Sequence, residues 1–180
     1  MKKFITIIIC SLFLFGCSCS DMGAKNAVTD YLSQYNNLSE EVLDDLDKVS
    51  SGEEFNDKQR ELYKEIIKKQ YQDLKYEIVD EKYNGDQAII TAKITVYDLY
   101  KAQKDASLYM NEHVEGFYDK NNIYSNKKYL DYKLEQMKKM TDTTMYTIDF
   151  EVVKKDGNWI VEQPSTADLE KIHGIYDYKD

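Results

Sequence analysis

The feature that most restricts the fold of this chain is the dipeptide Asn84-Gly85, which separates two stretches of strand-like sequence. Asn-Gly is the strongest short-range signal for a two-residue hairpin turn, because such turns need positive φ angles. The stretches Tyr76 to Tyr83 and Gln87 to Asp98 are therefore expected to form an antiparallel hairpin. In the second stretch every other residue is apolar, which predicts a strand with one face in the core. The residues expected on that face are Ala88, Ile90, Ala92, Ile94 and Val96.

A second hairpin is expected near the C-terminal end, at the dipeptide Asp156-Gly157. Asp-Gly favours the same class of turn. Trp159 and Val161 follow the turn, and alternating apolar residues precede it. The residues that precede it with a period of two are Tyr146, Ile148, Phe150 and Val152. Together the two hairpins predict a sheet of at least four antiparallel strands.

Three other regions carry apolar residues three or four positions apart, which is the period of an amphipathic helix. They are residues 24–74, residues 99–140 and residues 165–174. In the first region, Asn56 and Gln59 have the spacing of a capping box, so a new helix is expected to begin there. The chain is thus predicted to hold one α+β domain, residues 24–180. Its antiparallel sheet packs on the N-terminal helices, and a helical insert lies between the two hairpins.

The first residues resemble the signal of a bacterial lipoprotein precursor. Lys2 and Lys3 precede a short apolar segment that ends in the lipobox-like run Leu14-Phe15-Gly16-Cys17. The resemblance implies a signal peptide over residues 1–16 and a diacylglycerol thioether at Cys17, with residues 17–23 as the lipidated cysteine and tether. A retained membrane helix is disfavoured, because about 12 apolar residues fall short of the ~20 that span a bilayer. Cleavage without lipid attachment stays open, since Phe15 is bulkier than usual at its position.

Cysteine content and charge fit an extracytoplasmic, lipid-anchored chain. Of the three cysteines, Cys10 lies in the predicted signal peptide, and only Cys17 and Cys19 remain beyond it, so the folded domain has neither a disulfide nor a paired-cysteine metal site. The net charge is −9, and it becomes −11 when Lys2 and Lys3 are removed. An acidic surface repels nucleic acid and anionic lipid head groups, so neither is expected as a general partner. Membrane attachment is expected through the lipid on Cys17.

Few residues are candidates for chemistry. Asp98 ends the second strand on its apolar face and is the candidate pocket residue, although an acid just before a helical pattern is more often an N-cap. His113 and His173 lie near helix ends, where a dipole contact is the commoner role. Asp119 begins a segment that lacks the later ligands of a calcium loop. We expect no catalytic residue, metal site or cofactor.

Tyrosine is the compositional exception, with 16 residues in the chain. Many lie on the apolar helix faces and are expected in the core. Exposed tyrosines supply contact area together with a hydroxyl group, which suits binding of a peptide, a glycan or a partner protein. The segment Phe117 to Tyr132 is therefore the candidate recognition surface. Its tyrosines cluster around the polar break in the insert, and they are Tyr118, Tyr124, Tyr129 and Tyr132.

The order of helices, hairpin, helices and hairpin resembles the nuclear transport factor two-like superfamily, whose cystatin-like cone is a curved antiparallel sheet wrapped around a long helix. It is most similar to small lipoproteins of Gram-positive bacteria that carry this fold. The resemblance implies that an enzyme of this kind would use an acid, a His or a Tyr inside the cone. The long insert departs from the compact family pattern. The residues that carry the resemblance are Ala27, Val28, Tyr31, Leu32, Asp156, Gly157, Asn158, Trp159, Ile160 and Val161.

The expected function is that of a lipid-anchored extracytoplasmic binding or accessory module without catalytic activity. Its partner would be an envelope protein, a peptide or a glycan. The alternatives are a cone-pocket enzyme of the isomerase, dehydratase or hydrolase type, and a carrier of a small ligand. These alternatives need a solvent-reachable pocket with convergent polar groups, whereas a module can be filled solid.

Overall fold

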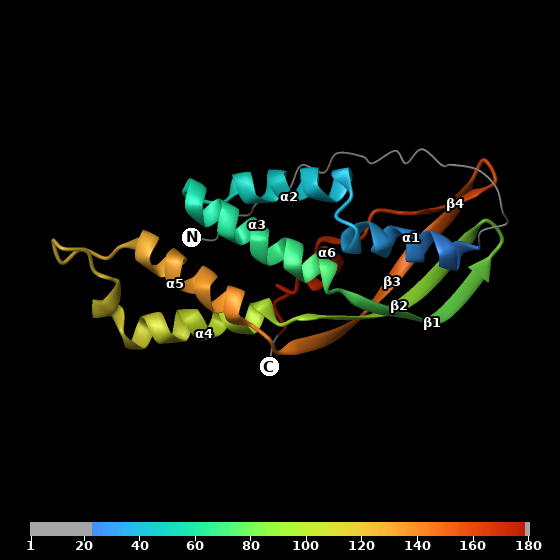
Figure 1. Ribbon diagram of the computed structural model, residues 1–180. Coiled ribbons are helices and arrows are strands. Elements are labelled where there is room, and N and C mark those ends of the chain that lie inside the picture. The colour runs from blue at the N-terminus through green and yellow to red at the C-terminus, as the bar shows by residue number, and fades with distance from the viewer. Residues whose placement is uncertain (1–22, 179–180) are drawn as a thin grey trace.

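The computed structural model describes residues 23–178, which fold into six α-helices, one 3₁₀ helix and one four-stranded antiparallel sheet (Figure 1). The α+β class and the insertion of helices between two hairpins are confirmed. In chain order the elements are α1 (Ala24–Asn36), α2 (Glu40–Gly52), α3 (Asp57–Gln72), β1 (Lys75–Asn84), β2 (Gln87–Tyr97), α4 (Leu99–Glu112), η1 (Val114–Phe117), α5 (Asn126–Lys139), β3 (Thr143–Lys155), β4 (Asn158–Val161) and α6 (Thr166–His173).

The sheet has the order β1-β2-β3-β4, so each strand pairs with its neighbour in the sequence. The turn between β3 and β4 has the predicted centre, because Asp156 and Gly157 both have positive φ angles, 52° and 83°. The turn between β1 and β2 is one residue further along than predicted. Asn84 pairs with Gln87 as part of the ladder, so Gly85 and Asp86 form the turn. Glycine with φ 60° at the first turn position is the arrangement that a type II′ turn requires.

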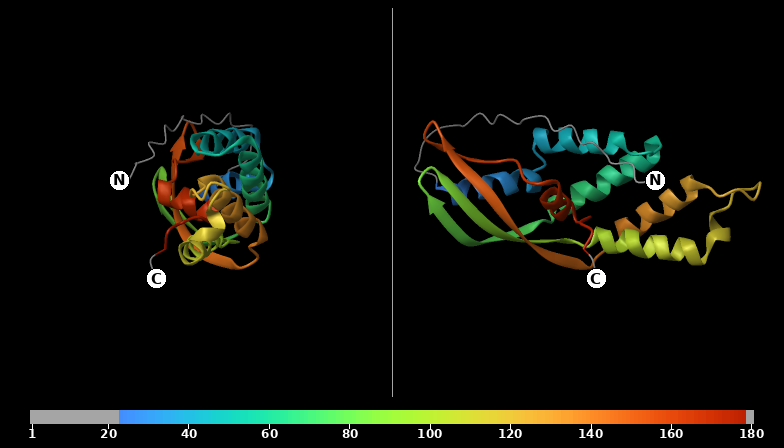
Figure 2. Two further views of the ribbon diagram at one scale, coloured as in Figure 1. Left: turned by 90° about the vertical axis from the view of Figure 1, so that its left-hand side faces the viewer. Right: turned by 180° about the vertical axis from the view of Figure 1, so that it is seen from behind.

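The helix α1 packs against the inner face of the curved sheet and fills it (Figures 1 and 2). Val28 and Leu32 of α1 are fully buried, and Tyr31 contacts Phe150 of β3 with ring centroids 5.8 Å apart. The predicted apolar face of β2 is confirmed, because each of its residues is at most 4 % exposed. Burial of this many aliphatic side chains supplies the main stabilisation, at about 25 cal/mol per Å² of apolar surface.

Helices α4 and α5 continue beyond the end of the sheet at which β2 ends and β3 begins, whereas α6 packs against β2 (Figure 1). The capping box predicted for α3 is present: the Gln59 N–H donates to the Asn56 side chain at 3.1 Å, and the Asn56 N–H donates to that of Gln59 at 3.0 Å. The insert, α4 to α5, packs along α3 through a hydrogen bond from Gln59 to Asp131 (2.8 Å) and an ion pair between Lys138 and Glu65 (2.9 Å). These contacts hold the insert beside α3, and the insert forms one end of the molecule (Figure 1).

A buried amide joins the sheet to the helices. Gln70 of α3 is 1 % exposed; its side-chain oxygen accepts the N–H of Tyr97 at 2.8 Å, and its amide donates to the carbonyl of Ile172 at 3.1 Å. Beside it, the carbonyl of Gly174 accepts the N–H of Tyr100 at 2.9 Å. Gly174 has a φ of 72°, and a Cβ there would lie 2.3 Å from the Tyr97 carbonyl oxygen. Only glycine allows this close approach.

Replacement of Gln70 by alanine should lower the free energy of unfolding by about 2–4 kcal/mol. The substitution leaves the N–H of Tyr97 and the carbonyl of Ile172 buried without their partner and opens a cavity. Chemical denaturation followed by circular dichroism measures the change. Gln72→Ala, an exposed glutamine on the same helix, is the control and should change stability by no more than about 0.5 kcal/mol. Equal effects of the two substitutions would contradict the role assigned to the buried amide.

Candidate partner-binding surface on the helical insert

The insert begins at Asp98, which joins β2 to α4. One carboxylate oxygen of Asp98 accepts the N–H of Lys101 at 2.9 Å and so caps α4, while the other accepts the Tyr178 hydroxyl at 2.8 Å. The N–H of Asp98 donates to the carbonyl of Asp142, which lies just before β3, at 2.9 Å. The capping role that the sequence favoured for this residue is the one that the structure gives it. Through these bonds Asp98 joins the base of the insert to the segment before β3 and to the chain after α6.

An aromatic cluster joins α4, η1 and α5 near the far end of the insert. At its centre is Phe117, which is 5 % exposed and contacts the rings of Tyr129 and Tyr132 edge to face at 6.1 Å and 5.6 Å. Tyr109 of α4 stacks on Tyr132 of α5 at 4.9 Å and also on His113 at 4.2 Å. Aromatic pairs in these geometries contribute about 0.5–1.5 kcal/mol each beyond their burial. The cluster therefore fixes the two helices relative to each other.

Two of the four candidate tyrosines belong mainly to this cluster. Tyr129 and Tyr132 are half-buried, and the Tyr129 hydroxyl lies 2.7 Å from the hydroxyl of Ser107 on α4. Tyr118 and Tyr124 lie outside it and face each other in an isolated antiparallel bridge at the base of the connecting loop. Tyr118 is half-buried, and Tyr124 is 40 % exposed. The structure thus brings all four residues to one end of the molecule but leaves mainly Tyr124 accessible.

The loop between the bridged tyrosines is held by its own backbone. The Asp119 carboxylate accepts the N–H groups of Ile123 at 3.0 Å and Asn121 at 2.8 Å, and these bonds lower the pKa of Asp119. The N–H of Asp119 donates to the carbonyl of Ile123 at 2.7 Å. The acid that began the incomplete calcium-loop pattern is therefore used to order the loop. Across residues 23–178, no group of His, Cys, Asp and Glu side chains is placed to hold a metal ion.

Four apolar side chains of this loop and of the last turns of α4 are exposed, and we call them the apolar tip. They are Leu108 (52 % exposed), Tyr109 (43 %), Ile123 (63 %) and Tyr124 (40 %). Sequence reasoning found Tyr124 but missed the other three as surface residues. Leu108 falls off the apolar stripe of its helix, and Ile123 lies in a polar loop. An apolar residue off the helical stripe and an isolated isoleucine in a polar loop are the sequence signals for exposure at these two positions.

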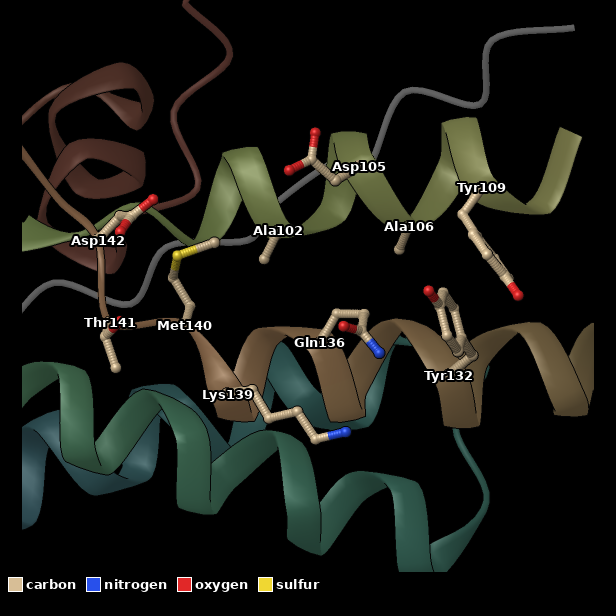
Figure 3. A pocket seen from close by; sticks show the side chains of 10 residues that line it. All are labelled: Ala102, Asp105, Ala106, Tyr109, Tyr132, Gln136, Lys139, Met140, Thr141 and Asp142. Atoms are coloured by element: carbon tan, nitrogen blue, oxygen red, sulfur yellow. The ribbon is translucent and has the colours of Figure 1, made fainter. Parts of the chain in front are cut away.

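A hollow of about 390 Å³ lies between α4 and α5, closer to the sheet than the tip (Figure 3). Ala102 and Ala106 line it on α4, Gln136 lines it on α5, and the stacked pair Tyr109 and Tyr132 closes one end (Figure 3). Asp98 does not line this hollow. The small alanine side chains leave room between the helices, and polar groups surround the opening.

The insert also differs from the rest of the chain in charge. Residues 99–139 contain eight lysines and six acidic residues. The other residues from Cys17 onward contain 14 basic and 27 acidic residues. The strong negative charge of this chain therefore arises outside the insert, so an acidic partner meets less repulsion at the insert than elsewhere.

The two histidines are placed near helix ends, as expected. The His113 ring stacks on Tyr109, and its Nδ1 lies 3.1 Å from the carbonyl of that residue. His173 lies at the end of α6 with its ring 5.6 Å from that of Tyr71, and burial lowers its pKa to about 4. A neutral, packed imidazole of this kind contributes to stability at neutral pH.

Comparisons of the chain with protein-family models, with curated protein sequences and with solved structures gave no match. Among residues 23–178, no helix is both long and apolar enough to span a membrane.

The largely buried imidazole of His173 should make stability depend on pH between about 6.5 and 4. Because the pKa is about 4 in the folded protein and 6.5 in an exposed histidine, the unfolded chain binds the proton more tightly in this window. The unfolding free energy contributed by this residue is thus complete above pH 6.5 and falls by up to about 3 kcal/mol as the pH falls to 4. Denaturation of the native protein and of His173→Gln across this range measures the difference. The variant should show a smaller loss of stability, and identical pH profiles would contradict the assignment.

Proposed function

We propose that this protein is a lipid-anchored extracytoplasmic module that binds an envelope protein or peptide through the apolar tip of its helical insert. The observation that carries the proposal is the position of the tip. Its four exposed apolar side chains lie on a helical extension whose shape is fixed by the aromatic cluster and the α3 contacts. Exposed apolar side chains on a rigid extension, one of them with a tyrosine hydroxyl, suit recognition of a protein surface.

The arrangement of the domain supports this use of the tip. The helix α1 begins beside the β1–β2 turn, at one end of the molecule, and the insert forms the other end (Figure 1). Strand β2 and helix α4 follow each other along this axis. At about 3.3 Å per residue in a strand and 1.5 Å in a helix, they span on the order of 55 Å. A lipid on Cys17, which is separated from α1 by six residues, would therefore hold the end opposite the tip.

The inner face of the sheet offers little support for the alternative of a cone-pocket enzyme. The side chains of α1 fill that face within the described residues, and Asp98 is engaged at the N-terminus of α4. The alternative of a small-ligand carrier now depends on the open hollow between α4 and α5 instead. The curved sheet around α1 supports the proposed relationship to the nuclear transport factor two-like superfamily, which is a proposal about architecture.

The lipid anchor has a direct test, since Cys17 and the lipobox-like run lie outside the described residues. Cells expressing the native protein should incorporate radioactive palmitate into it, and Cys17→Ala should abolish the label. Cys19→Ala is the matched control, because it removes the neighbouring thiol and leaves the lipobox intact. Label that persists in Cys17→Ala, or disappears in Cys19→Ala, would contradict lipidation at Cys17.

The binding role of the apolar tip can be tested by photo-crosslinking in the envelope. A benzoylphenylalanine in place of Tyr124 should form an adduct that excess soluble domain, residues 21–180, suppresses. A competitor with Ile123→Ser and Tyr124→Ser should be weaker by about tenfold or more, because it lacks two exposed contact side chains.

The same photoreactive group in place of Val79 is the control for this experiment. Val79 lies on the sheet and is 51 % exposed, so it is as accessible as the tip residues. A partner that binds at the tip leaves this position uncrosslinked. Equal adducts at both positions, or equal competition by the doubly substituted domain, would refute the proposed surface.

A further inference from the structure

An aromatic pair occupies the end of the molecule from which the tether leaves. Tyr83, near the end of β1, is 52 % exposed and contacts the ring of Trp159 on β4 edge to face at 5.8 Å. Trp159 is partly exposed and is the only tryptophan in the chain. The ammonium group of Lys154 lies 5.8 Å from the centre of its ring. Neither aromatic residue has a part in the apolar tip, which lies at the opposite end.

The start of α1 is fixed to this pair. The Tyr83 hydroxyl donates to a Glu81 carboxylate oxygen at 3.0 Å. The ammonium of Lys25 lies 3.3 Å from the other oxygen of Glu81. A Cβ placed on Gly23 would be 3.5 Å from the Tyr83 hydroxyl. The point at which the tether enters the domain is therefore next to Tyr83.

The tether is short on the scale of the domain. Six residues, 18–23, separate Cys17 from α1. A flexible chain of that length has an end-to-end distance of about 13 Å, and its full extension is about 20 Å. A lipid at Cys17 would thus hold Tyr83 and Trp159 within this distance of the bilayer surface.

The charges around the pair are largely balanced. Lys82 is paired with Asp80 at 3.0 Å, and Lys155 is paired with Glu162 at 2.9 Å. Paired charges give little net attraction to anionic head groups. Trp and Tyr, by contrast, favour the membrane–water interface, because each has an apolar ring and a polar group.

We propose that Tyr83 and Trp159 form a bilayer-contact surface, which seats the anchored domain on its own membrane with the insert directed away from it. The proposal rests on the lipid anchor of the proposed function. The contact would come from insertion of the two aromatic rings at the membrane–water interface and not from attraction between charges. Contact is thus expected with zwitterionic lipid as well as with anionic lipid.

The single tryptophan allows a direct measurement. The chain from Cys17 onward, with Cys19→Ser, is coupled through Cys17 to maleimide lipid in phosphatidylcholine vesicles that contain a nitroxide-labelled head group. Trp159 fluorescence should be strongly quenched, with a blue shift of its emission. The distal control carries Trp159→Phe and Tyr124→Trp, and its reporter should be quenched severalfold less. Equal quenching of the two reporters, or stronger quenching at the tip, would overturn the proposed orientation.

A longer tether separates true contact from mere proximity. When a flexible Gly-Ser segment of 20 residues is inserted after Ser20, a contact surface should keep most of the Trp159 quenching, whereas a domain that is only held nearby should lose it. Adding Tyr83→Ser to the lengthened tether should reduce the quenching severalfold. Loss of quenching on lengthening alone would overturn the proposal. Because the coupling is chemical, these results do not depend on whether cells acylate Cys17, which the palmitate experiment decides separately.

Discussion

The structure depends on one buried amide at the junction of sheet and helices. Gln70 reaches from α3 to the last residue of β2 and to the end of α6, and both of its polar atoms are used. Gly174 lets the chain after α6 approach the Tyr97 carbonyl closely enough to bind the first turn of α4. A buried amide that lacks one of its partners costs free energy. The bonds of Gln70 therefore favour the arrangement in which all three segments are in place together. This junction sets the direction in which the insert leaves the sheet.

Filling of the sheet by α1 leaves the two proposed interaction surfaces at the two ends of the domain. The inner face of the sheet is closed by aliphatic side chains and by the contact of Tyr31 with Phe150. Exposed aromatic groups are consequently found where the regular elements end. At one end Tyr83 and Trp159 lie beside the start of α1, and at the other the aromatic cluster supports the apolar tip. These are the two ends that we propose for contact with the membrane and with a partner.

The local chemistry of the sequence predicted much of the fold. The capping box at Asn56, the alternation in β2 and the Asp156-Gly157 turn are short-range features, and each was correctly placed. The β1–β2 turn was displaced by one residue, because the pairing of Asn84 with Gln87 fixes the register and turn propensity alone does not. Asp98 caps α4 in the structure. Its role could not be assigned from the sequence alone, because it depends on which N–H groups and hydroxyls lie near the carboxylate.

The sequence by itself determined the main elements, their order and the buried face of the sheet, because each is written in residues close together along the chain; attachment at Cys17 is a prediction from the same kind of local pattern. Only the tertiary structure decided which residues are accessible and how far apart the two ends lie. Tyr129 and Tyr132 look like Tyr124 in the sequence, but contacts with α4 and η1 bury them in part, while Ile123 is left exposed. Exposure and orientation arise from contacts between segments distant in the chain, which no local pattern encodes.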